Sequence, residues 1–600
     1  MDTPLPSNET LVEFSSAVPW QEVERQKRLF NEKLQDLIQS SSDDDLSLET
    51  FADAIGTPVS SVFDLHDKNS ANILMAHVNG HQYMLGSVVS SRYRSGKSLL
   101  ESIVPYNLNP SVNHTNIQET DAPTTRIRAL GAEIELGLLH RDGAGPTEDQ
   151  MQEYISAYQF HARRLGITPQ LDREACQYQI EAHIAPGVGY HRTRSALEGI
   201  MSALVASSEQ TGLITAIMSS YPTESDFKLT DNPKVRTAVD LMVEINGYFP
   251  EYVERLNEAK SRYQIAPDAN VTEVFRIQAC HVHLDLAGRS EALGLFAFYT
   301  MLRSATAVAG CSVLKGGPFV NGTCDEELLC TREYLRRTTV TGRYLEMPIS
   351  PHLQPDGLAR YSDLMRSERV NAMARALLYE DGLGSPISAM HNAIGRVRPD
   401  LGSSKRICTL EATGMPVNIS ASRQAAVLTD FEFTHALIES YFRKHGANLE
   451  PMYDDQVLWG IIGPLDATEF RRQHDLSDLH CSDAPIKTAA GVEMTLSEFY
   501  EMKRVYMHKH LADIAHIAPR EIDDVYSSLQ RMLNPPGGRQ AETVEQYIHD
   551  YKLRSTGNWG QILKNAFIEE GGVPGTHNPQ AVLRVVNRVH DAIRERYLQN

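Results

Sequence analysis

Acidic residues and histidines recur at every second position in several segments of this chain that otherwise have the composition of β-strands. In the segment 127–139, Glu133 and Glu135 alternate with Ile134 and Leu136. Because side chains i and i+2 of a strand point to the same face, the glutamates would lie side by side and the aliphatic residues would face a core. Adjacent carboxylates repel one another, so this segment indicates either a bound divalent cation or a solvated edge strand.

Three further segments repeat the arrangement, each with acids, amides or imidazoles at alternate positions. The residues that would share one face are Gln179, Glu181 and His183 in the first, His281, His283 and Asp285 in the second, and Glu411 in the third. A single His-x-His pair on a strand is more often structural than a ligand site. Four strands that direct such groups to one face would repel one another without cations. With Mg²⁺ they would form a site for nucleotide phosphates, since this ion bridges carboxylates and phosphate oxygens.

Phosphate chemistry also needs positive charge, and arginines follow the His-x-His segment. Arg303 falls within an expected helix over 290–309, which is apolar nearly all round and would end at Gly310. A buried arginine needs partners, so Arg303 is a candidate for phosphate binding. Four more arginines follow within about 40 residues: Arg332, Arg336, Arg337 and Arg343. For at least two of them, the alternative is a position on a solvated helix face.

The length of 600 residues predicts two or three substructures. We expect an N-terminal appendage over 1–125, a catalytic core over 126–445 and a helical region over 446–600. The fold class expected is α+β. An antiparallel-rich sheet with an acidic concave face would be backed by helices and followed by the helical C-terminal part.

Several local elements have specific signals. Asn79-Gly80 between two apolar runs predicts a hairpin over 72–88, because both turn positions tolerate positive φ. Thr147 and Gln150 can form a capping box, which predicts a helix from 147 to 164. Further expected helices span 18–39, 194–207 and 579–597, and a polar linker is expected over 107–123.

Charge and cysteine usage exclude some classes of function. The formal net charge is −20 and no strongly basic stretch occurs, which argues against nucleic-acid binding. The seven cysteines show no paired spacing and fit a reducing cytoplasm better than a disulfide framework. Cys280 and Cys408 would point away from the acidic face into the core. Without a run of ~20 apolar residues or a signal peptide, we expect a soluble, cytoplasmic protein that does not cross a membrane. There is no P-loop segment and no dinucleotide fingerprint.

The order of the motifs resembles a known family. A Gly-x-Glu-x-Glu strand is followed by Gln-x-Glu, then by His-x-His with a long buried helix, and finally by a strand bearing a glutamate. This order is similar to that of the carboxylate–amine ligases. More specifically, it resembles the glutamate–cysteine ligase type 2 group of the glutamine synthetase-like superfamily. The resemblance covers roughly 126–442, about half of the chain.

The resemblance implies a glutamine synthetase-like catalytic core that uses ATP with Mg²⁺, or with Mn²⁺ in its place. It implies that Glu133, Glu135, Glu181 and Glu411 are metal ligands and that one of His281 and His283 lies near the nucleotide phosphates or an ion. From the residues themselves we also expect Gln179 and Lys405 near the nucleotide, and Arg303, Arg332 and Arg336 in catalysis. In the family an arginine commonly follows the late glutamate by two residues, whereas Thr413 stands there in this chain. Phosphate stabilisation would then come from Lys405, Arg406 or the arginines of 332–343.

The implied activity is the ATP-dependent joining of a glutamate-like carboxylic acid to an amine through an acyl-phosphate, with release of ADP and phosphate. Both substrates would be small molecules, and superfamily relatives often assemble, so a homo-oligomer stays open. Two alternatives also remain. One is another phosphoryl-transfer or deamidase chemistry on the same sheet. The other is a non-catalytic ATP-binding regulatory protein, which Thr413 favours and the intact acids oppose.

Overall fold

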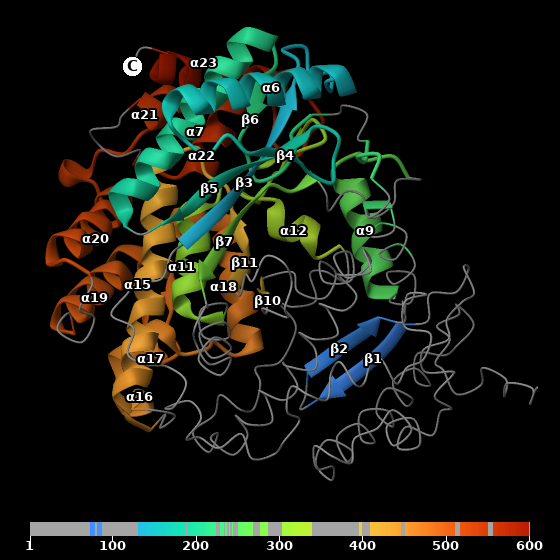
Figure 1. Cartoon of the computed structure of the whole chain (residues 1–600). Helices are drawn as coiled ribbons and strands as arrows, with labels where there is room; N and C mark the ends of the chain where they lie inside the picture. Colours follow the sequence, from blue (N-terminus) through green and yellow to red (C-terminus); the bar gives the residue numbers. More distant parts are fainter. Residues whose placement is uncertain are drawn as a thin grey trace, which may run out of the picture.

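Of the 600 residues, the computed structural model describes 73–78, 81–86, 130–187, 189–223, 228–232, 235–236, 239, 243, 250–267, 276–285, 303–338, 395–398, 409–445, 450–510, 517–549 and 556–598 (Figure 1). The expected helix over 18–39, the expected linker over 107–123, Arg343, Lys405 and Cys408 lie outside these ranges.

A seven-stranded antiparallel sheet forms the centre of the described part of the chain. Its strands follow the order β10-β11-β7-β3-β5-β4, and β6 pairs with β3. The four segments with alternating acids and histidines therefore become neighbours, in the order β11, β7, β3 and β5. The strands span Leu130–Leu139 (β3), Leu171–Arg173 (β4), Gln179–Gly187 (β5), Ile214–Ala216 (β6), Ala279–Asp285 (β7), Gly395–Arg398 (β10) and Thr409–Pro416 (β11).

Strand β7, which carries the His-x-His pair, begins at Ala279. The three residues before it are described and leave the sheet's register. Ile277 forms an isolated bridge with Ser220, and Gln278 N donates to the carbonyl of Ser219. These backbone bonds satisfy the polar groups of the segment without continuing β7 along β3.

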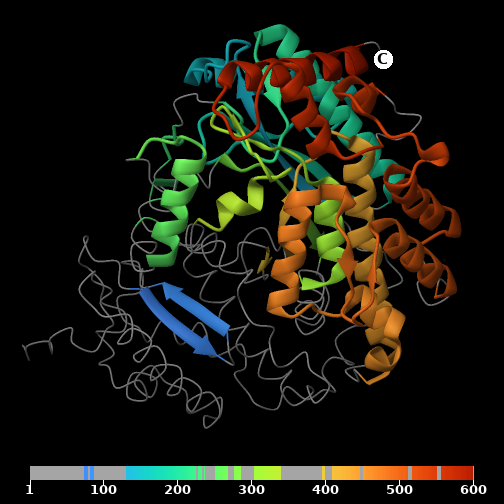
Figure 2. The same ribbon diagram turned by 180° about the vertical axis from the view of Figure 1, so that it is seen from behind.

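Apolar side chains on one face of the sheet pack against helices. Ile134, Leu136, Ile180 and Val282 are all at most 4% exposed and belong to a single hydrophobic cluster. Helix α7 packs on β5, and α11 packs on β11 and on α15 (Figures 1 and 2). The alternation seen in the sequence thus separates a buried apolar face from a face that carries the acids. These helices span Tyr190–Thr211 (α7), Ala305–Leu314 (α11) and Ala421–His445 (α15).

Helix α6 (Glu148–Leu165) confirms the predicted capping box. Thr147 Oγ1 accepts a hydrogen bond from Gln150 N, and Gln150 Oε1 accepts one from Thr147 N. Helix α6 packs on α7, which is longer at both ends than the predicted 194–207. The box fixes where α6 begins, because it satisfies two backbone donors that no helical carbonyl can reach.

The prediction that a helix ends at Gly310 is wrong. Helix α11 continues through Gly310 to Leu314, and all its residues are buried. A Cβ at this position would meet Val427 and Phe431 of α15 at 3.0 Å. The glycine is therefore explained by the close approach of two buried helices, not by a helix stop.

The C-terminal part of the chain is helical, as the sequence predicts, and the fold is α+β. Its residues join the same hydrophobic cluster as the sheet, and α23 packs against α7 and β6 (Figure 2). The predicted last helix over 579–597 is confirmed. The helices are α16 (Glu450–Asp454), α17 (Gln456–Ile462), α18 (Ala467–His480), α19 (Leu496–Lys509), α20 (Pro519–Leu533), α21 (Val544–His549), α22 (Trp559–Glu569) and α23 (Pro579–Leu598).

A fully buried ion pair joins helix α15 to helix α19. Lys503 Nζ of α19 lies 2.5 Å from Asp430 Oδ1 of α15, and neither side chain is exposed. The ammonium also donates to the hydroxyls of Thr434 and Thr306. The fold can bury the Lys503 ammonium because oxygen atoms of Asp430, Thr434 and Thr306 accept its hydrogen bonds.

The predicted hairpin near residue 80 is confirmed by the pairing of β1 (Ile73–Val78) with β2 (His81–Gly86), in which Val78 faces His81. The six described cysteines are buried and free, and Cys280 packs in the core as expected. Among the described helices, none is long and apolar enough to cross a membrane.

Candidate functional site

The polar face of the sheet brings glutamates and histidines from neighbouring strands into register. Glu133 of β3 is the register partner of His281 on β7 and of His183 on β5. Two positions along β3, Glu135 lies directly opposite Glu181 of β5. Cross-strand partners on one face have Cβ atoms ~5 Å apart, so their functional groups meet.

His281 lies at the centre of this group. Its Nδ1 is 3.2 Å from Glu133 Oε2 and 4.0 Å from Glu411 Oε1, and its Nε2 is 3.4 Å from Glu135 Oε1. His283, the register partner of Glu411, places its Nε2 3.2 Å from the same Glu133 oxygen. Both nitrogens of the His281 imidazole therefore face carboxylates, which come from β3 and β11.

These side chains offer donor sets suited to a divalent cation. Three groups have one ligand atom from each residue, all within 4.8 Å of one another: Glu133, His281 and Glu411; Glu133, Glu181 and His183; and Glu135, Glu181 and His281. Carboxylate oxygens suit Mg²⁺, and imidazole nitrogen additionally suits Mn²⁺ and other transition metals. The Glu411 side chain is fully buried, and those of Glu133, Glu135 and Glu181 are 11–19% exposed. A cation could thus be reached by solvent and still be held in a low-dielectric site.

The electrostatics of the face show why it needs positive charge. Burial opposes ionisation of Glu133, yet hydrogen bonds with His281 and His283 bring its pKa well below the usual range. Burial, together with repulsion from Glu174 and the neighbouring glutamates, raises the pKa of Glu181 to about 11. Neighbouring carboxylates thus oppose the ionisation of Glu181, and a bound cation would relieve this repulsion.

The structure brings together all four predicted metal ligands, Glu133, Glu135, Glu181 and Glu411, and both predicted histidines, His281 and His283. Glu135 also uses its second oxygen, since Oε2 accepts a hydrogen bond from Ala279 N at 2.7 Å. The predicted nucleotide contact Gln179 is 3% exposed, and its amide donates to the carbonyl of Ile277 at 3.0 Å. Gln179 therefore fastens β5 to the segment before β7.

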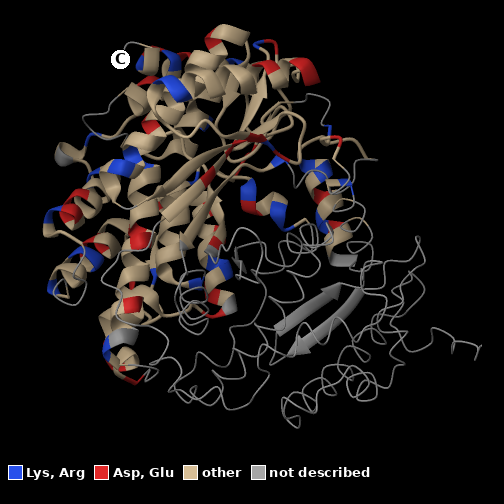
Figure 3. Cartoon of the chain, in the orientation of Figure 1, with Lys and Arg blue, Asp and Glu red and all other residues tan. Residues whose placement is uncertain are grey.

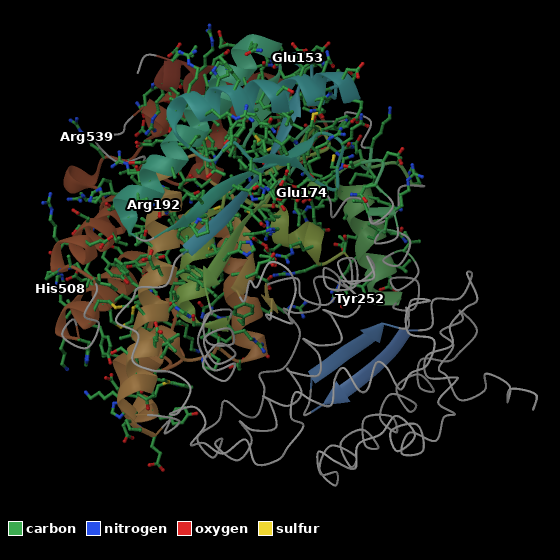
Figure 4. The ribbon with its side chains drawn as sticks, viewed as in Figure 1. Glu153, Glu174, Arg192, Tyr252, His508 and Arg539 are labelled. Carbon is green, nitrogen blue, oxygen red and sulfur yellow. The ribbon has the colours of Figure 1, made fainter. Side chains whose placement is uncertain are left out.

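Two further acids adjoin the site and were missed from the sequence. Asp172 Oδ2 on β4 lies 3.0 Å from His183 Nε2. The other ring nitrogen of His183, Nδ1, faces Glu133. Glu174, just after β4, is labelled in Figure 4, and burial together with repulsion from Glu135 raises its pKa to about 7. The short β4 spans only three residues, so period-two alternation could not reveal either acid.

Arg332 opens helix α12 (Arg332–Arg336), which carries basic residues beside the acidic strands in Figure 3. Its side chain is 1% exposed. The guanidinium donates to three backbone carbonyls, those of Gln278 at 3.1 Å, Gly414 at 3.0 Å and Thr413 at 2.9 Å, and to the carboxylate of Glu333. Arg332 thus reaches the position where the family resemblance implies an arginine, but it contacts the main chain there.

The other predicted arginines have different surroundings. Arg303 precedes α11, its guanidinium lies 5.6 Å from the ring centroid of Phe470, and its carbonyl accepts a bond from Leu465 N. Arg336 is 4% exposed and lies 3.4 Å from Glu333 Oε1. These contacts of Arg303 are with α18 and the segment before it, and this contact of Arg336 is within α12.

Comparisons with known proteins give distant structural similarities. No protein-family model matches the chain, and no curated protein matches its sequence. A bifunctional glutathione synthetase from Pasteurella multocida is similar with a TM-score of 0.39 and 12% identity, over 81% of this chain and 54% of that chain. This chain therefore spans about half the length of that protein.

A second similar structure is the complex between the prokaryotic ubiquitin-like protein Pup and its ligase PafA. The TM-score is 0.33 with 11% identity, over 79% of each chain. At these TM-scores the similarity carries no functional argument, and the assignment of function depends on the side chains of the sheet.

Proposed function

We propose that the acidic face of the sheet binds ATP with Mg²⁺ or Mn²⁺, and that the chain is an ATP-dependent carbon–nitrogen ligase. In the proposed reaction, a carboxylic acid attacks the γ-phosphorus of ATP and releases ADP. An amine then attacks the acyl-phosphate, forms the amide bond and releases phosphate and a proton. The acid is glutamate-like and the product γ-glutamyl-type, as the resemblance in motif order implies.

The observation that carries the proposal is the convergence of donors from four adjacent strands. Glu133, Glu135, Glu181, His281 and Glu411 come from β3, β5, β7 and β11, and they supply overlapping donor sets within 4.8 Å. A solvated polar edge would not explain this arrangement, because Glu411 is fully buried and β3 is an interior strand. A bound cation would neutralise the phosphate and carboxylate charges that meet here.

In this reaction the side chains of the site would position the nucleotide and neutralise the charge of its phosphates. Glu411 and Glu133 would hold a divalent ion that neutralises charge on the nucleotide phosphates, and His283 would lie near those phosphates. Arg336 and Arg303 remain our proposed arginines for phosphate contact, together with Lys405. Phosphoryl transfer depends mainly on such positioning and electrostatic stabilisation, so no covalent enzyme intermediate is required.

The test is nucleotide turnover by the purified chain with Mg²⁺, ATP and pooled carboxylic acids and amines, with products identified by mass spectrometry. The proposal predicts ADP and phosphate in equal amounts with a new amide. AMP with pyrophosphate would contradict the acyl-phosphate route, and a stable phosphorylated product without an amine would indicate a kinase.

The variant that tests the metal site is Glu133→Gln, which keeps the shape of the side chain and replaces one carboxylate shared by two of the donor sets. It should lose turnover while its unfolding midpoint stays near that of the parent protein. Full turnover by Glu133→Gln would show that the nucleotide is bound elsewhere. Tight Mg·ATP binding by the parent protein without turnover would favour a regulatory protein.

A further inference from the structure

Strand β11 contains an irregularity two residues after Glu411. Ala412 pairs with Val282 and Met415 pairs with Cys280, so three steps along β11 match two steps along β7. One extra residue therefore bulges out of β11 between Ala412 and Met415. A bulge interrupts the ladder of hydrogen bonds, and the carbonyl groups within it need other donors.

The guanidinium of Arg332 supplies those donors. It donates to the carbonyls of both bulge residues, Thr413 and Gly414, and through Nε to the carbonyl of Gln278, which directly precedes β7. Glu333, 1% exposed, accepts from the same Nη1 that reaches Gly414. A planar fork can bind three carbonyls from two strands at once, whereas an ammonium is a single point charge.

We propose that Arg332 is a positioning residue, which fixes the β11 bulge against the start of β7 and thereby holds Glu411 in the metal-binding register. The inference rests on the proposed function, because it concerns the same cation site. Side chains alternate along a strand, so a slip of one residue at the bulge would move Glu411 from the acidic face to the opposite face. Arg332 acts through the main chain and need not contact substrate or phosphate.

The experiment measures Mn²⁺ binding by the full chain, from the electron paramagnetic resonance signal of free Mn²⁺, for the parent protein and for Arg332→Lys. We expect the substitution to raise the Kd for Mn²⁺ about tenfold or more, as the loss of a residue that orients a metal ligand does elsewhere. Hydrogen exchange should also speed up in the peptide 409–416.

Arg423→Lys is the matched control. Arg423 is also fully buried, and it also donates to three backbone carbonyls, those of Val313, Met532 and Gly557. Both variants should lower the unfolding midpoint, but only Arg332→Lys should weaken Mn²⁺ binding. A merely structural role for Arg332 predicts the same Kd in both variants.

An unchanged Kd in Arg332→Lys would overturn this inference alone, as would an equal rise of the Kd in Arg423→Lys. A parent protein that binds no Mn²⁺ would overturn the proposed cation site, and this inference with it. If Arg332→Lys does not fold, Glu333→Gln tests the same point, since it removes the charged partner of the guanidinium. A rise of about threefold in its Kd is expected, because a charged hydrogen bond orients the guanidinium more firmly than a neutral one. No rise would refute the role.

Discussion

Glu432 provides a sharp test of how burial controls charge in this fold. The residue lies on α15, is 2% exposed, and accepts a hydrogen bond at Oε2 from Gly189 N, before the start of α7. Its other oxygen has no hydrogen-bond partner among the described residues. Burial raises its pKa from 4.5 to about 8, with Gly189 N–H and Arg192 opposing the rise and the negative charge of Glu521 adding to it.

The magnitude follows from linkage between proton binding and folding. At roughly 1.4 kcal/mol per pH unit, a folded pKa of about 8 against 4.5 in the unfolded chain corresponds to a penalty of about 5 kcal/mol. The unfolded carboxyl ionises first as pH rises, so the folded state binds more protons between pH 4.5 and 8. Stability therefore falls as pH rises through this window, and the whole penalty is present above pH 8.

Glu432→Gln keeps the shape and the acceptor for Gly189 N–H but cannot ionise. Urea unfolding at pH values from 5 to 9 should give nearly equal free energies for the two proteins at pH 5. As pH rises, the free energy of unfolding of the variant should exceed that of the parent protein by a growing amount, up to about 5 kcal/mol at pH 9. A difference that does not change with pH would refute the reasoning. Glu521→Gln, which removes the neighbouring negative charge, should make the parent protein's pH dependence shallower.

Two further predictions concern packing and buried charge. Lys503→Met leaves Asp430 buried without its cation, so it should reduce the free energy of unfolding by about 3–5 kcal/mol, and adding Asp430→Asn should recover part of that loss. Chemical denaturation checks both, and a loss under about 1 kcal/mol would contradict the buried pair. Gly310→Ala should reduce the free energy of unfolding by about 1–3 kcal/mol, because the new methyl group meets Val427 and Phe431 at 3.0 Å. Phe431→Leu in the same chain should restore part of it, and a stabilised Gly310→Ala protein would show that the helices can separate freely.

The faces of the central strands could be predicted from sequence because alternation is a local property. Glu133, Glu135 and Glu181 needed only the two-residue period of an extended chain to be placed on one face. The capping box at Thr147 was equally local, since it depends on a residue three positions away. The register of β3 with β5 and the capping bonds of α6 confirm both kinds of signal.

Features that depend on distant parts of the chain could not be predicted. Gly310 has the same sequence signature as a helix stop, and only the approach of α15 explains it. The contacts of Arg332 depend on a bulge in a strand some 80 residues away, whose existence no local pattern indicates. Glu174 lies beside the site because β4, the three-residue strand that precedes it, pairs with β5. Neighbours across a sheet are set by packing of the whole domain, which a short window does not contain.

The central claim is that the acidic face holds a divalent cation, and the most direct measurement is anomalous diffraction from crystals of the full chain grown or soaked with Mn²⁺. A peak among Glu133, His281 and Glu411, absent in Glu411→Gln, is the predicted result. Ordered Mn²⁺ elsewhere in the molecule, with none between these three side chains, would contradict the account.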